Sequence, residues 1–143
     1  MKKLLFLLIP AAFMIQSCSK GCTDESATNY SADAKKDDGN CQYEATLTLW
    51  WEQSQSISWN QSGVTGLNVY VGEVLVGNGN DDPGAYNVTA PDCEEAGTIT
   101  VTKNLGASSS KDIAWQVKDQ NDATLKSGSW AATGGACDVV KVE

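Results

Sequence analysis

Short runs in which apolar and polar residues alternate follow one another from Ala45 to the end of this 143-residue chain. In the run Gly97–Thr102, Ile99 and Val101 alternate with threonines, so the apolar side chains would share one face of a strand. Gly, Asn, Asp and Ser separate such runs at intervals of roughly 8–12 residues. This pattern predicts an all-β fold, a single antiparallel β-sandwich of about seven or eight strands without an amphipathic helix.

The same alternation separates a predicted core from a predicted surface. In the first strand, Leu47 and Leu49 share a face with Trp51, whereas Trp50 points to the other side. Trp115 has the phase of its apolar neighbours further along the chain. We expect inward-facing side chains at Leu47, Leu49, Trp51, Ile99, Val101, Ile113, Trp115 and Val117.

Less regular segments predict further elements. Gly72-Glu73 separates two apolar runs, and a glycine at the first central position predicts a type II′ hairpin turn. Residues 78–84 are dense in turn-forming residues and predict a loop. Additional strands are expected at Ile57 and Trp59, over residues 86–89 and over residues 138–142.

Five cysteines constrain the chain covalently, and the first of them follows a segment typical of exported proteins. Two lysines precede an apolar run over residues 4–15, and Ser17 stands directly before Cys18. A charged start, a short apolar run and a small-residue cleavage site are the features of a signal peptide. The run is also shorter than the about 20 apolar residues that span a bilayer. We therefore predict a signal peptide over residues 1–17 and acylation of Cys18, as in a bacterial lipoprotein.

An odd cysteine in an exported chain needs an explanation, because cysteines there are usually paired. Acylation of Cys18 leaves four cysteines, which allow three connectivities. We expect Cys22 to pair with Cys41 around a short polar segment, and Cys93 to pair with Cys137 across the downstream domain. Crossed pairings would instead tie the segment to the domain. The alternative for Cys18 is a free thiol behind an ordinary cleaved signal.

These features divide the chain into a signal peptide (1–17), an acylated anchor with a disulfide loop that acts as a spacer (18–44), and a β-sandwich domain (45–143). The loop carries the motifs Gly21-Cys22-Thr23-Asp24, Asn29-Tyr30 and Asp37-Asp38-Gly39-Asn40-Cys41. With these motifs it resembles a cysteine-framed repeat that recurs, often in tandem, in exported and surface proteins of diderm bacteria. That resemblance implies a location outside the cytoplasm and no established catalytic role.

The downstream domain carries a second resemblance. Its hairpin Leu67–Gly77, its run Gly97–Val101 and the late cysteine before Val140 are similar to small immunoglobulin-like or PEGA-like sandwich domains of bacterial envelope lipoproteins. This resemblance implies an immunoglobulin-like fold, and it says less about function because such folds host many activities.

The charge of the chain excludes one class of partner. Removal of residues 1–17 takes away Lys2 and Lys3 and no acidic residue, so the net charge moves from −8 to −10. The chain contains no arginine, and its lysines are scattered except at Lys35-Lys36. Without a basic stripe we expect no nucleic-acid binding. Repulsion from anionic surfaces leaves the acyl chains on Cys18 as the membrane attachment.

Catalysis is not expected. The chain has no histidine, which is the commonest general base and a leading zinc ligand. Two carboxylate pairs, Asp81-Asp82 and Glu94-Glu95, could act as acid and base in a glycoside hydrolase, but neighbouring acids in a loop are usually solvated. A carboxylate-dependent hydrolase is therefore the weaker alternative.

Two ligand hypotheses remain. Calcium takes six to eight oxygen ligands, and the disulfide loop gathers carboxylates and an amide, although without EF-hand spacing. The simpler interpretation is that these side chains form local turns. Glycan binding would use exposed aromatic rings as platforms. The candidate calcium ligands are Asp24, Asp33, Asp37, Asp38 and Asn40, and the candidate platforms are Trp50, Trp59, Tyr70 and Trp130.

The sequence thus predicts a lipid-anchored envelope lipoprotein of the bacterial outer membrane, on the periplasmic or the cell-surface face. Its sandwich would be a non-enzymatic binding, adhesion or structural module with a glycan or protein partner and no cofactor, calcium apart. The alternative function is a glycan-binding protein or an accessory to a polysaccharide-processing system.

Overall fold

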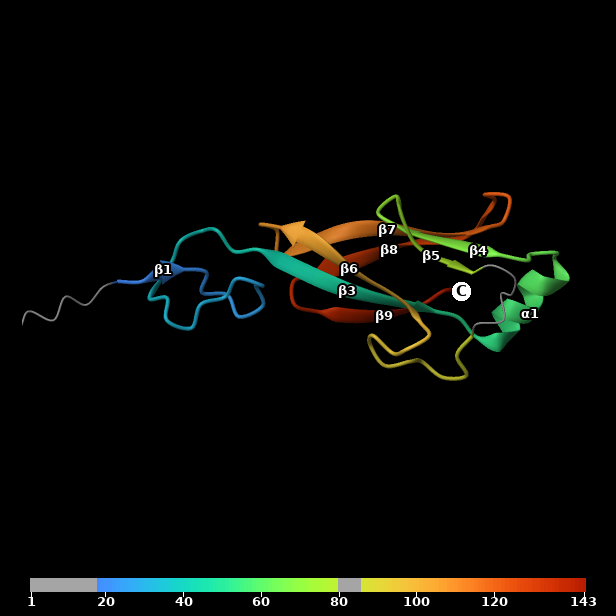
Figure 1. The fold of residues 1–143 in the computed structure, drawn as a ribbon, viewed down its shortest axis with the longest axis horizontal. Helices are drawn as coiled ribbons and strands as arrows, with labels where there is room; N and C mark the ends of the chain where they lie inside the picture. The colour runs from blue at the N-terminus through green and yellow to red at the C-terminus, as the bar shows by residue number, and fades with distance from the viewer. Residues whose placement is uncertain (1–17, 80–85) are drawn as a thin grey trace, which may run out of the picture.

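The computed structural model describes residues 18–79 and 86–143. The expected signal peptide and the Asp81-Asp82 pair lie outside the described residues. Figure 1 shows the order of the elements along the chain. They are β1 (Lys20–Gly21), β2 (Lys36–Asp37), β3 (Tyr43–Trp50), α1 (Gln53–Gln61), β4 (Leu67–Val71), β5 (Val74–Gly79), β6 (Ile99–Gly106), β7 (Ser110–Asp119), β8 (Thr124–Thr133) and β9 (Cys137–Lys141).

Two sheets pack face to face, which confirms the predicted all-β sandwich (Figure 1). One sheet has three strands in the order β6-β3-β9, and the other has four in the order β5-β4-β7-β8. The expectation of a purely antiparallel sandwich is wrong at one pair, because β3 and β9 are parallel. The chain leaves β8 through Gly134-Gly135 and enters β9 where β3 also begins, so Cys137 lies beside Thr46 and both strands run the same way.

The core lies between the sheets, on the faces that the alternation predicts. Leu47 and Leu49 of β3 face Val69 and Val71 of β4, and all four are almost completely buried. Burial of a side chain of this size stabilises a fold by about 1.5–3 kcal/mol. The expected inward positions Trp51, Ile113, Trp115 and Val117 are also buried, and Ile99 and Val101 pack partly buried against them.

The hairpin between β4 and β5 turns at Gly72-Glu73, as expected, but its turn is of another type. Gly72 has a φ of 57° and Glu73 a φ of 64°. Positive φ at both central positions is the signature of type I′, whereas type II′ has it only at the first. A non-glycine residue therefore occupies a left-handed position here, which the sequence did not indicate.

The strand expected at Ile57 and Trp59 is wrong, because both residues lie in helix α1. Serines alternate with larger residues there, which imitates a strand, but burial follows a helical spacing. Ser56 and Trp59, three residues apart, are buried, while Ile57 is exposed. The ring of Trp59 packs edge-on against Trp51, with centroids 5.4 Å apart, so a tertiary contact selects the helix.

Helix α1 stops at a Schellman motif. Gly63, with φ 81°, donates its N–H to the carbonyl of Asn60, and Val64 donates its N–H to the carbonyl of Trp59, both at 3.0 Å.

Tyr86–Thr89, expected as an edge strand, forms no strand. Instead the N–H of Asn87 donates to the Trp51 carbonyl at 3.0 Å.

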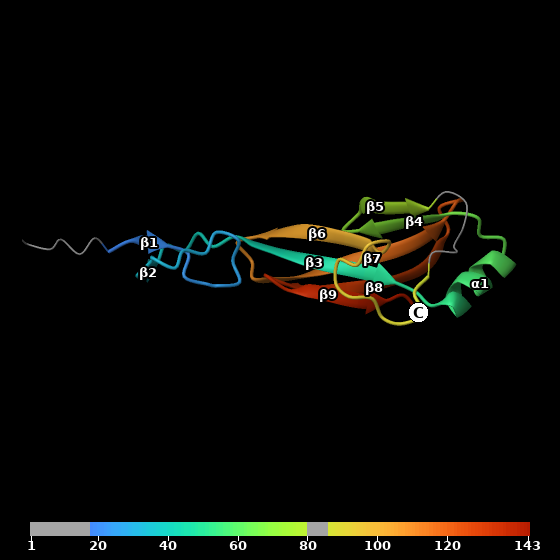
Figure 2. The ribbon, with the colours of Figure 1, turned by 60° about the horizontal axis from the view of Figure 1, so that its bottom comes forward.

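The segment before β3 extends from one end of the sandwich (Figure 2). It is mainly loop, as expected, with the short parallel pair β1 and β2 and a disulfide between Cys22 and Cys41. Ala27 is buried where the segment meets the sandwich, and the Tyr43 hydroxyl donates to Asp24 at 2.7 Å. Within residues 18–79 and 86–143, no helix is long and apolar enough to cross a membrane.

Candidate functional site

The elongated molecule has two distinct ends. Cys18 is exposed and begins the described chain at one end, and α1 covers the opposite end (Figure 1). Between them the sandwich lies with its strands along the long axis (Figure 2). A group attached to Cys18 would therefore lie far from any site beside α1.

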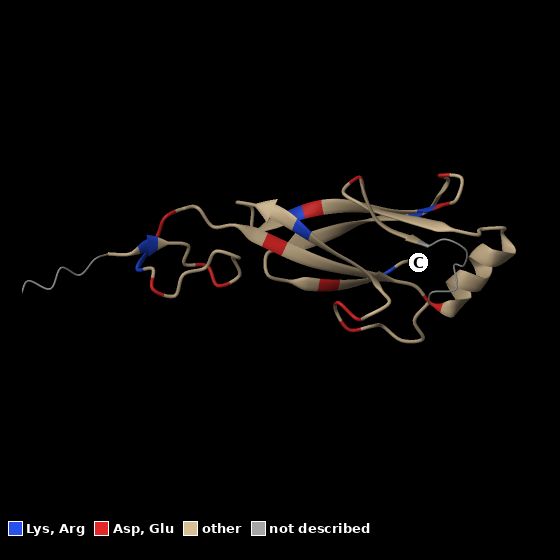
Figure 3. Ribbon diagram, viewed as in Figure 1, with Lys and Arg blue, Asp and Glu red and all other residues tan. Residues whose placement is uncertain are grey.

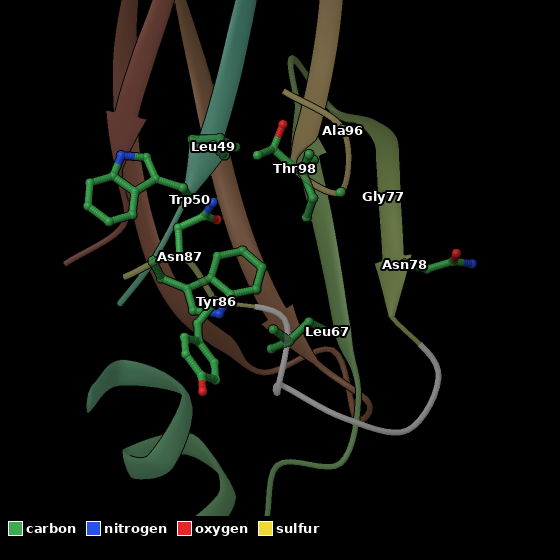
Figure 4. A pocket seen from close by; sticks show the side chains of 12 residues that line it. Leu49, Trp50, Leu67, Gly77, Asn78, Tyr86, Asn87, Ala96 and Thr98 are labelled. Carbon is green, nitrogen blue, oxygen red and sulfur yellow. The ribbon is translucent and has the colours of Figure 1, made fainter. Parts of the chain in front are cut away.

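A cleft opens near the α1 end, between the edge strands β5 and β6 of the two sheets. We call it the distal cleft. Its volume is about 410 Å³, within the range of ligand pockets. Figure 4 shows its residues, which come from β3 and the residue after it, from β4, β5 and β6, and from the segments that precede β6. They are Leu49, Trp50, Trp51, Leu67, Gly77, Asn78, Tyr86, Asn87, Ala96, Gly97, Thr98 and Ile99.

The sheet register builds the apolar part of the distal cleft. Leu49 pairs with Ile99 across β3 and β6, and Leu67 begins β4 in the facing sheet. Gly77 completes the contact between the two edges: a Cβ at this position would lie 3.2 Å from Ile99. The absence of a side chain at Gly77 therefore lets β5 approach β6 without filling the space beside them.

Polar groups also line the distal cleft. The Tyr86 hydroxyl accepts a hydrogen bond from Gln53 of α1 at 2.9 Å and points toward the helix (Figure 4). The Asn87 side chain lines the cleft, whereas Asn78 points away from its centre (Figure 4). The buried indole Nε1 of Trp51 has no hydrogen-bond partner in the part of the chain that the structure describes. The cleft thus combines apolar walls with polar groups, which are the Tyr86 hydroxyl, the Asn87 amide and the buried Trp51 Nε1.

Of the four aromatic residues expected to present rings, two are in the core. Trp59 is 5% exposed and packs on Trp51. Trp130 is 3% exposed, and its Nε1 donates to Asp138 at 2.7 Å, which joins β8 to β9. Their burial leaves neither ring as a surface platform.

The other two expected aromatic residues lie under lysines. Trp50 is 8% exposed and touches the distal cleft, and its ring has Lys141 Nζ at 5.8 Å. Lys141 also pairs with Glu52 at 2.9 Å, and hydrogen bonds with this carboxylate and with Glu143 raise the pKa of Lys141. Tyr70 is half-buried on the outer face of β4 with Lys118 Nζ 5.0 Å from its ring.

The expected calcium ligands are engaged in local turns. Asp24 accepts hydrogen bonds from Ser26 and Tyr43, and these bonds lower its pKa. Asp37 accepts from the N–H of Gly39, and Asp38 from that of Asn40. Asp33 offers its carbonyl to the Ser19 hydroxyl. No group of three or more His, Cys, Asp or Glu side chains that could hold a metal is found among the described residues.

The disulfides join Cys22 to Cys41 and Cys93 to Cys137, the two pairs expected. The second crosses the outer face of the three-stranded sheet. There Thr48 is fully buried, 3.8 Å from the Cys93 sulfur, and its hydroxyl accepts from the N–H of Glu94 at 3.1 Å. The bridge therefore holds the segment that continues into the cleft wall at residues 96–98.

Charged residues are dispersed along the described chain, and lysines form no continuous stripe along the ribbon of the sheets (Figure 3). The Glu95 carboxylate accepts a hydrogen bond from the N–H of Asp92 in its own loop at 2.8 Å, and Glu94 has a left-handed φ of 62°. Neither glutamate lines the distal cleft.

Sequence patterns did not reveal the distal cleft. Trp51 and Ile99 were expected in the core, and Tyr86 and Asn87 in a strand. They meet because β3 ends where β6 begins, a consequence of the antiparallel pairing. Comparison of the chain with protein-family models, with curated proteins and with solved structures finds no match.

Proposed function

We propose that this chain is a lipid-anchored lipoprotein of the bacterial outer membrane whose β-sandwich is a non-enzymatic binding module. The observation that carries the proposal is that Cys18 and the distal cleft lie toward opposite ends of the elongated molecule. The exposed Cys18 stands at one end, and the distal cleft opens near the other. A membrane anchor on Cys18 would direct the cleft away from the bilayer.

The segment between anchor and sandwich is suited to act as a spacer. Its disulfide closes a loop of 19 residues, and in the loop-entropy model such a bridge contributes about 3 kcal/mol. Ala27, Cys22 and Cys41 are buried, so the segment is packed as well as cross-linked. A packed spacer keeps the sandwich at a set distance from the acyl chains, where a flexible linker would not.

Non-enzymatic binding is favoured over hydrolysis by the chemistry of the cleft. The described residues that line it are apolar, aromatic, amide or hydroxyl-bearing, and the described carboxylates Glu94 and Glu95 lie outside it. General acid and base catalysis needs titratable groups within hydrogen-bond reach of the substrate. Binding needs only shape, apolar contact and hydrogen bonds.

The anchor is tested by expression of the whole gene in a diderm host. We expect a mature chain that begins at Cys18 with the mass of a diacylglycerol thioether and its amide-linked acyl chain, in the outer-membrane fraction. Cys18→Ser is the matched control and should yield an unacylated chain that is lost from this fraction. A soluble wild-type chain with the Cys18 sulfur in a disulfide would contradict the proposal. Protease treatment of intact cells then distinguishes the surface face from the periplasmic face.

A second candidate function, an accessory to a polysaccharide-processing system, is favoured by the mixed apolar and amide lining of the cleft. It differs from the first in requiring a glycan as the ligand.

A further inference from the structure

We infer that the distal cleft binds an uncharged saccharide, through apolar contact with its walls and hydrogen bonds from Trp51, Tyr86 and Asn87. This inference rests on the proposed function, because it names the ligand class of the proposed binding module.

The cleft matches the two kinds of surface that a sugar ring presents. A sugar has apolar C–H faces and a rim of hydroxyl groups that both donate and accept hydrogen bonds. Leu49, Leu67 and Ile99 supply apolar wall, and all three are buried or partly buried. The Asn87 amide and the Tyr86 hydroxyl supply a donor and acceptors at the rim. Pockets with apolar walls and a few polar groups are the usual form of small-ligand sites.

The Trp51 indole is the strongest single indication of a polar ligand. Its Nε1 atom is buried and has no partner among residues 18–79 and 86–143, although Trp51 lines the cleft. A buried donor without an acceptor destabilises a protein, and such groups usually have an explanation in water or a ligand. Since Nε1 is buried, a hydroxyl oxygen of a bound sugar would accept this hydrogen bond after a small rotation of the indole toward the cleft.

Trp115 shows why the Trp51 donor is informative. Its Nε1 is also buried without a partner in the described chain, but its ring lies on Gly128 in the interior of the sandwich. Trp115 does not line the distal cleft, so packing against β8 accounts for its position. Of the two tryptophans, Trp51 alone lines the distal cleft, so only its indole lies beside a space that a ligand could fill.

The charge of the residues around the cleft indicates which class of saccharide would bind there. The described residues that line the cleft carry no charge, and the whole chain has a net charge of −8. An acidic sugar would lose hydration in the cleft without gaining a cationic partner from this lining. Uncharged hexose or pentose chains avoid that cost.

The test uses the purified, acylated mature chain in a neutral detergent. Hexasaccharides of glucose, mannose and xylose are titrated by calorimetry and by tryptophan fluorescence, and hexagalacturonate is the charged counterpart. We expect at least one neutral hexasaccharide to bind with one site per chain, and hexagalacturonate to bind at least tenfold more weakly.

Two variants test the cleft, and one serves as a control. Trp51→Phe replaces the indole by a smaller phenyl ring and removes the Nε1 donor, and Asn87→Ala removes the rim amide. Each is expected to weaken binding about three- to tenfold, the effect of one hydrogen bond. Asn121→Ala changes an exposed turn between β7 and β8 and should bind like the wild type. Because a phenyl ring is smaller than the buried indole, Trp51→Phe should lower the thermal midpoint, and its binding is compared with that of the wild type at a temperature where both chains are folded.

The inference is overturned if none of the three neutral hexasaccharides binds to the folded chain, if a fatty acid occupies the cleft in their place, or if the acidic hexasaccharide binds more tightly. It is likewise overturned if both cleft variants bind as the wild type does. These failures leave the anchor intact. A chain that binds a neutral saccharide but lacks acyl groups would instead contradict the proposed lipoprotein.

Discussion

The hydroxyl of Tyr43, the first residue of β3, donates a 2.7 Å hydrogen bond to a carboxylate oxygen of Asp24. Nineteen positions of sequence and the Cys22–Cys41 loop separate the two residues. Gly134 lies beneath the Tyr43 ring, where a Cβ would come within 2.5 Å of it. Tyr43 therefore connects the disulfide segment, the first long strand and the turn that leads to β9.

The Asp24–Tyr43 pair predicts how docking of the disulfide segment depends on pH. Bonds from the Ser26 N–H, from Tyr43 and from the Ser26 hydroxyl lower the Asp24 pKa below its ordinary value of 3.8. A lowered acid pKa means that the pair's stabilisation is complete above about pH 4 and is lost as pH falls through the folded-state pKa. The bond to Asp24, followed by burial, raises the Tyr43 pKa above 10.0, so stabilisation is also lost as pH rises through that raised value.

Hydrogen exchange of residues 22–41 should accordingly be slowest between about pH 4 and pH 10 after correction for the intrinsic rate. Tyr43→Phe should raise exchange in this segment and leave β7 and β8 unchanged. If segment protection in Tyr43→Phe equals that of the wild type at pH 7, the bond does not hold the segment.

The two disulfides should stabilise different parts of the molecule. Cys93 and Cys137 close a loop of 44 residues on the outer face of the three-stranded sheet, so their joint replacement by serine is expected to cost about 4 kcal/mol of unfolding free energy. Replacement of Cys22 and Cys41 should cost about 3 kcal/mol, confined to the segment before β3. Urea unfolding followed by tryptophan fluorescence reports the first, and limited proteolysis the second. Equal protease sensitivity of the segment in both double variants would contradict this division.

Gly128 should not tolerate a side chain. A Cβ there would lie 2.5–2.9 Å from ring atoms of Trp115, a buried residue that has little room to move. Gly128→Ala is expected to destabilise the sandwich by about 1–3 kcal/mol, the range for an overfilled core. Ser129→Ala, at the exposed neighbouring position, is the control and should change stability by less than about 0.5 kcal/mol. Thermal unfolding of both variants provides the measurement, and a wild-type midpoint for Gly128→Ala would show that Trp115 relocates freely.

Calcium should have little effect on stability. The carboxylates of Asp24, Asp37 and Asp38 already accept hydrogen bonds from nearby groups of their own loop. A ligand that binds only the folded state raises its stability by mass action. We therefore expect a dialysed sample to keep its thermal midpoint when millimolar Ca²⁺ is added, with Mg²⁺ as the ionic-strength control. A Ca²⁺-specific rise of several degrees would restore the calcium hypothesis.

Local patterns in the sequence predicted a large part of this fold. Alternation of period two assigned Leu47, Leu49 and Val117 to the core, because a strand sends successive side chains to opposite faces. The small size of the Cys22–Cys41 loop and the wide spacing of Cys93 and Cys137 indicated how the cysteines pair. Each of these inferences depends on neighbours in sequence or on covalent chemistry.

Other features depended on contacts between distant segments. Trp59 lies in a helix because it packs on Trp51, although the serine-rich sequence around it alternates like a strand. Trp130 is buried because Asp138 of the other sheet accepts its N–H.

The sequence alone thus determined most of the strands, which faces of those strands are apolar and which cysteines form the two disulfides. Only the tertiary structure decided that β9 runs parallel to β3, that Trp59 and Trp130 are internal and that a cleft opens between β5 and β6. The physical reason is that periodicity and turn chemistry act over a few residues. Sheet order and the space left between edges arise when strands far apart in the chain compete to bury the same apolar surface.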